Sequence, residues 1–67
     1  MINNLYKIEQ LAIHAIDASG KDLMDRMKLA KEVTGFFAVG TDNESIAKSI
    51  YSLIQNELGI DLDNYNI

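Results

Sequence analysis

The sequence predicts a small all-α domain, an antiparallel arrangement of three helices followed by a short C-terminal tail. Three observations predict it: apolar residues recur at helical spacing, the 67-residue chain contains no proline, and its glycines fall near the ends of the periodic segments. With 48% hydrophobic and 24% charged residues, the composition is that of a globular protein. We expect one domain over residues 1–67, with helices at about 3–18, 20–37 and 42–58 and a tail at 59–67.

The first expected helix, at about 3–18, has an unusually wide apolar surface. Its polar residues recur at spacings of three and four and form one narrow stripe: Asn3, Lys7, Gln10, His14 and Asp17. Leu5, Ile8, Ala12 and Ile16 lie on the opposite side. A surface helix needs an apolar arc of only about 100°. This helix therefore needs neighbours on two sides, and we expect dimerisation or another protein to complete the core.

The second expected helix, at about 20–37, follows a capping-box pattern in which Ser19 caps the helix and Asp22 reaches back three residues later. One set of its residues alternates spacings of four and three and predicts the seam that packs on the bundle: Leu23, Met27, Ala30, Thr34 and Phe37.

The third expected helix, at about 42–58, begins with a second capping box, Thr41 with Glu44. Its predicted buried stripe consists of Ile46, Ile50, Leu53 and Ile54. Gly59 followed by Ile60 is typical of a C-terminal glycine cap. Short connections between the helices favour antiparallel packing.

The residue inventory points away from catalysis, cofactors and metals. The chain has no cysteine and a single histidine, which argues against disulfides, thiol chemistry and multi-histidine sites. His14 has Asp17 three residues on, but no substrate-orienting group accompanies the pair, so we expect a surface histidine. Residues 61–65 begin like a calcium loop, yet Tyr65 and Asn66 stand where such loops need Asp or Asn and then Gly. We expect no enzymatic activity.

The candidate partner-binding residues lie at the end of the second helix and in the tail. The apolar anchors are Phe36, Ile60, Leu62 and Tyr65, and the acidic residues beside them are Asp61 and Asp63. For Phe36, core packing and a contact surface both remain open, as do packing of the tail on the domain or on a partner. Residues 39–67 contain five acids and one base and carry the whole net charge of −4, which would steer the chain to a basic partner.

These observations favour a small acidic interaction module that binds another protein, itself or both, and modulates or inhibits a larger protein. The heavy use of Ile and Asn suits an AT-rich coding sequence, such as that of a low-GC bacterium, a phage or a mobile element. The absence of cysteine and of a signal or spanning segment predicts a cytoplasmic protein without membrane contact. No small-molecule substrate is evident.

Two alternatives remain open. The first is a helical DNA-binding regulator, although the acidic balance argues against nucleic acid. It would need its basic residues to cluster in space: Lys7, Lys21, Arg26, Lys28 and Lys31. The second is a structural subunit of a homo-oligomeric assembly.

Overall fold

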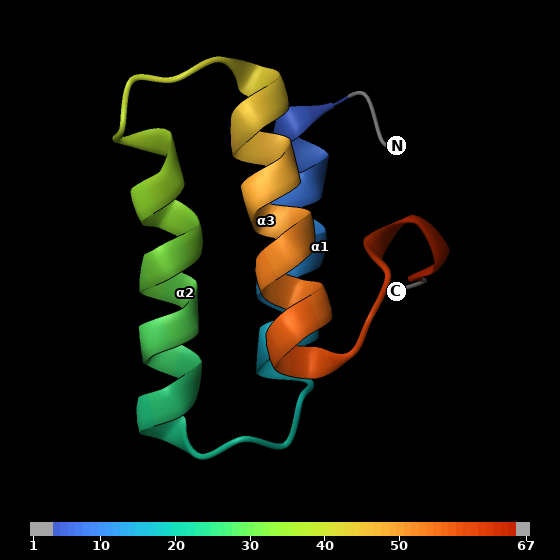
Figure 1. Ribbon diagram of the computed structural model, residues 1–67. Coiled ribbons are helices and arrows are strands. Elements are labelled where there is room, and N and C mark those ends of the chain that lie inside the picture. The colour runs from blue at the N-terminus through green and yellow to red at the C-terminus, as the bar shows by residue number, and fades with distance from the viewer. Residues whose placement is uncertain (1–3, 66–67) are drawn as a thin grey trace.

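The computed structural model describes residues 4–65 and shows the expected small all-α domain (Figure 1). Its elements are α1 (Leu5–Asp17), α2 (Leu23–Phe37), α3 (Asn43–Leu58) and a 3-10 turn, η1 (Leu62–Asn64). The helices run antiparallel to their neighbours along the chain, and α1 packs against both others. The turn η1 packs against α1 and α3, on the side of the bundle away from α2.

The first helix begins where its cap places it. The Asn4 side chain accepts the backbone N–H groups of Tyr6 and Lys7, at 3.0 and 3.3 Å, so α1 starts at Leu5. It ends at Asp17, one residue before the expected end. The expected start at Asn3 lies outside the described residues, as does the end of the tail at 66–67.

The expected capping box at Ser19 is wrong. The Ser19 hydroxyl donates to the carbonyl of Ile16 at 2.6 Å and accepts the N–H of Lys21 at 3.2 Å, so it closes the turn after α1. Gly20 has a left-handed φ of 79°, which interrupts helical geometry there. α2 therefore begins only at Leu23, after Asp22, whose side chain makes no capping hydrogen bond.

The capping box at the start of α3 is also wrong, by one residue. The cap is Asp42 rather than Thr41, and its carboxylate accepts the N–H of Ser45 at 2.7 Å. The backbone N–H of Ser45, followed by its side chain, lowers the pKa of Asp42 because both hydrogen bonds favour the charged carboxylate. At the other end, Gly59 adopts the left-handed conformation expected of a glycine cap, with a φ of 68°.

The wide apolar arc of α1 is covered within the chain. Its buried residues are Ile8, Leu11, Ala12, Ala15 and Ile16. All of these except Ala15 meet Leu29 and Val33 from α2, the buried stripe of α3 and Leu62 from η1 in one hydrophobic cluster. The buried stripe of α3 consists of Ile46, Ala47, Ile50 and Ile54. Three elements thus provide the neighbours that the arc requires.

The orientation of α2 differs from the expected seam by roughly a quarter of a turn. Its buried residues are Leu29 and Val33, while Leu23 and Met27 are 62% and 61% exposed. The true stripe also passes Arg26, which is half-buried and donates from Nε to the carbonyl of Lys21 at 2.9 Å. Because that stripe begins with a charged residue, apolar spacing alone favoured the wrong face.

We expect Leu62→Ala to lower the free energy of unfolding by about 2 kcal/mol or more, because this side chain is only 1% exposed and leaves a cavity when truncated. Leu23→Ala is the matched control and should change stability by no more than about 0.5 kcal/mol. Chemical denaturation measures both. Equal effects of the two substitutions would contradict the burial of the C-terminal turn.

We expect Asp42→Ala to destabilise the protein in a pH-dependent manner. Because the pKa of Asp42 is lower in the folded chain than in the unfolded chain, its stabilising effect is complete above the ordinary aspartate pKa of about 3.9. The effect is lost as the pH falls through the lowered folded value. Denaturation of wild type and variant between neutral and acidic pH measures the difference. Thr41→Ala should have no such effect, and a larger loss with Thr41→Ala would reassign the cap.

Candidate functional site

The predicted tail residues are held mainly by contacts within the chain. Leu62 lies in the core, and Ile60 and Tyr65 are half-buried against it. The Asp61 carboxylate caps η1: it accepts the backbone N–H of Asp63 at 3.0 Å and the side-chain amide N–H of Asn64 at 3.2 Å. Leu62 therefore contacts its own domain rather than a surface open to a partner.

Two hydroxyl groups tie the C-terminal turn to the helices. The Tyr65 hydroxyl lies 2.6 Å from Nδ1 of His14 on α1, and the two ring centroids are 5.7 Å apart. The Tyr51 hydroxyl on α3 donates to the carboxylate of Asp63 at 2.6 Å. Both pairs are solvent-exposed. His14 thus has a structural partner far along the chain in addition to its helical neighbour Asp17.

Phe36 does not join the tail in one surface. It is half-buried in the last turn of α2 and packs against the hydrophobic core. The turn η1 contacts α1 and α3 but not α2. The six predicted binding residues therefore divide between two separate places, and their apolar members are wholly or partly used by the fold.

A larger exposed apolar surface lies on α2, where the sequence placed the packing seam. We define the outer face of α2 by its exposed residues on the side opposite Leu29 and Val33: Leu23, Met24, Met27, Lys28, Lys31, Thr34 and Gly35. Met24 is 81% exposed, beside Leu23 and Met27. Three residues of the predicted seam, Leu23, Met27 and Thr34, belong to this exposed face, whereas the other two, Ala30 and Phe37, are half-buried. Met24 was not part of the predicted seam.

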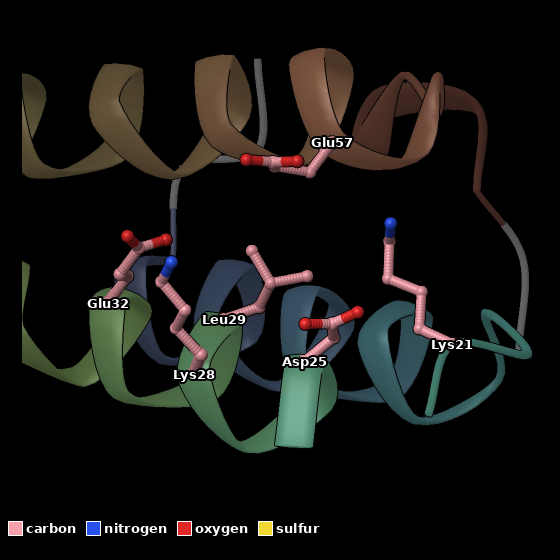
Figure 2. A pocket seen from close by; sticks show the side chains of 6 residues that line it. All are labelled: Lys21, Asp25, Lys28, Leu29, Glu32 and Glu57. Atoms are coloured by element: carbon pink, nitrogen blue, oxygen red, sulfur yellow. The ribbon is translucent and has the colours of Figure 1, made fainter. Parts of the chain in front are cut away.

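A shallow pocket lies between α2 and α3 near their ends (Figure 2). Glu57 reaches it from α3, and the other lining residues come from α2 and the turn before it: Lys21, Asp25, Lys28, Leu29 and Glu32. Leu29 is buried between these charged side chains. With carboxylates and ammonium groups interspersed, the pocket presents no field of one sign to a charged ligand.

The described residues contain little that resembles a chemical site. Between residues 4 and 65 no polar or charged side chain is buried. In the same range no group of three or more His, Cys, Asp or Glu residues is arranged to hold a metal ion. Asp61 and Asp63, the start of the calcium-like segment, have roles within the fold as a cap and as the acceptor of Tyr51.

Of the five basic residues considered for DNA binding, four lie on α2 or in the turn before it, and Lys7 lies apart from them on α1. Lys7 lies in the first turn of α1, whereas Lys21 lies in the turn before α2. These two helix starts lie at opposite ends of the antiparallel pair (Figure 1). The first turn of α3 carries Glu44 and follows Asp42, and both carboxylates disfavour contact with a phosphate backbone.

Comparisons of the chain with protein-family models, with curated protein sequences and with solved structures find no match. Among residues 4–65, none of the helices has the length and apolar character needed to cross a bilayer. A function for this chain must therefore be argued from its own surface.

We expect Tyr65→Phe to lower the free energy of unfolding by about 0.5–1 kcal/mol, because it removes the hydrogen bond to His14 and leaves the ring in place. Tyr6→Phe is the matched control, since Tyr6 is 75% exposed. It should change stability by less than about 0.5 kcal/mol. A Tyr65→Phe variant as stable as the Tyr6→Phe variant would show that the contact contributes nothing in solution.

Proposed function

We propose that this chain is a small cytoplasmic interaction module that binds a larger protein and regulates it by covering part of that protein's surface. The observation that carries the proposal is the outer face of α2. Leu23, Met24 and Met27 are each more than 60% exposed there, within little more than one helical turn. Apolar side chains grouped in this way on a small domain are typical of a protein contact.

The tail is the weaker candidate for the contact surface. Leu62 would have to leave the core to reach a partner, and its withdrawal would uncover apolar surface on α1 and α3. The acidic groups of Asp61 and Asp63 are exposed and remain available for electrostatic steering. We therefore assign the apolar contact to α2 and to the tail only a long-range attraction of basic groups on the partner outside that contact.

Occlusion is the mechanism that best suits this chain. A domain with a Cα radius of gyration of 11.0 Å presents one helix face and blocks whatever else would bind the same site. Methionine suits such a face because its unbranched, flexible side chain adapts to an uneven surface. Self-association through the same face is compatible with this function, because a homodimer would hide the surface until a partner competes for it.

We expect Met24→Glu to reduce recovery of a stoichiometric partner at least about tenfold in a tagged pull-down from nuclease-treated bacterial lysate. The reason is that a charge replaces an apolar contact at the centre of the face. The substitution should leave the fold intact, because Met24 is exposed and an acidic residue is favourable in the first turn of a helix.

Tyr6→Glu is the matched control for this experiment. Tyr6 is exposed to a similar degree and occupies the second position of α1, as Met24 does in α2. It should retain the partner. A partner kept by Met24→Glu but lost by Asp61→Asn/Asp63→Asn would move the contact surface to the tail.

A further inference from the structure

We infer that the outer face of α2 accepts an amphipathic helix whose apolar stripe is bordered by carboxylates. This inference rests on the proposed function and adds the chemistry of the partner. It follows from the distribution of charge around α2, from the absence of an acid three or four residues from Lys31, and from the sizes of the side chains along the face.

The charged residues of α2 are only partly separated by side. Lys31 lies on the outer face. Lys28 lies at the border of that face and also lines the pocket toward α3 with Asp25 and Glu32 (Figure 2). Of the two lysines on the outer face, Lys28 has Asp25 and Glu32 three and four residues away, whereas Lys31 has no acid at either spacing. Although the chain as a whole is acidic, its excess charge lies in residues 39–67, in α3 and the tail.

Lys31 occupies the middle of this face. The residues three and four positions away, which are its neighbours on a helix surface, are Met27, Lys28, Thr34 and Gly35. None of them is acidic, so the helix itself offers no ion pair to the Lys31 ammonium. A carboxylate on a helix lying along α2 would meet this charge while its apolar residues cover Met24 and Met27.

The side chains along the face also suit a helix. Its N-terminal half is bulky, with Leu23, Met24 and Met27, and its C-terminal half is small, with Thr34 and Gly35. Apart from its chain neighbours and the backbone of its own helix, no atom lies within 4 Å of the position that a Cβ on Gly35 would take. A partner helix could approach the backbone closely at Gly35 and pack its larger side chains there, with its smaller ones over the methionines.

Two other occupants fit less well. A second copy packed face to face about a twofold axis would bring the lysines of both outer faces into one interface without a carboxylate. An anionic bilayer is a broad surface and would be repelled by the net charge of −4. A single acidic helix, in contrast, contacts only α2. Salt screens its repulsion from the acidic groups of α3 and the tail, because the Debye length is about 8 Å and the bundle extends 31 × 24 × 18 Å.

The test uses two synthetic peptides of about three heptads, each with leucine at positions a and d. One carries glutamate at e and g, and the other carries lysine there, so neither pairs with itself. Each is titrated into the isotope-labelled full chain, and backbone amide shifts give the site and the Kd. We expect the acidic peptide to shift amides of the outer face of α2 and to bind about tenfold more tightly than the basic one.

Lys31→Glu should abolish or reverse this preference. Lys48→Glu is the matched control on α3, where Lys48 lies 3.5 Å from Glu44, and it should preserve the preference. Equal binding of both peptides at α2 would overturn the acidic partner but leave the proposed contact surface standing. Binding of neither peptide would overturn the inference, and the pull-down with Met24→Glu would then decide on the proposed function separately.

Two further arms address the other occupants. Shifts of the same amides on dilution without peptide, together with a dimer by light scattering, would replace the acidic helix by a second copy. Binding to vesicles of an anionic phospholipid, lost with Met24→Glu, would replace it by a lipid surface. If the inference is correct, the free chain is monomeric at the titration concentration and does not bind the vesicles.

Discussion

The structure depends on covering the wide apolar arc of α1. A helix with polar residues along only one narrow stripe exposes more apolar surface than a single neighbour can cover. A 67-residue chain has few elements with which to cover it. The solution is to place α1 at the centre, with α2 and α3 on two sides and the C-terminal turn closing the gap beside α3. Ile8, Ala12 and Ile16 are nearly inaccessible as a result. Most of the arc is thus covered within one chain, while at its start Leu5 is half-buried and Tyr6 is 75% exposed.

This solution decides which surfaces remain for a partner. Because Leu62 fills the space between α1 and α3, the tail contributes its apolar residues to the core and leaves mainly acidic groups outside. α2 is the least surrounded helix: it buries only Leu29 and Val33 and turns its two methionines outward. One side of the bundle, on α2, therefore presents an apolar contact surface with lysines. The other side, on α3 and the tail, presents an acidic surface. Both would act in a module that binds a larger protein.

Much of the fold was predictable from the sequence because α1 and α3 have strongly one-sided patterns. The end of α3 was predictable too, since Gly59 satisfies a conformation that few other residues adopt. The rotation of α2 was not, because apolar side chains occupy both sides of that helix and the buried side includes Arg26. The sequence could not predict the cap of α3, because Thr41 and Asp42 are adjacent and both residue types cap helices well. The burial of Leu62 depends on contacts with residues distant in sequence, which no local pattern can predict. For that reason the sequence placed this residue among the partner-binding residues, whereas it lies in the core.

The central claim is that the C-terminal turn completes the core of its own chain. Nuclear Overhauser effects from the Leu62 methyl groups in the free protein test it most directly. We predict contacts from these methyl groups to side chains of both α1 and α3, with intensities that do not change on dilution. In a sample that mixes labelled and unlabelled chains, these contacts should appear only within one chain and not between chains. Random-coil shifts for residues 60–65, or contacts that arise only between differently labelled chains, would contradict it and return the tail to the role of a partner-binding segment.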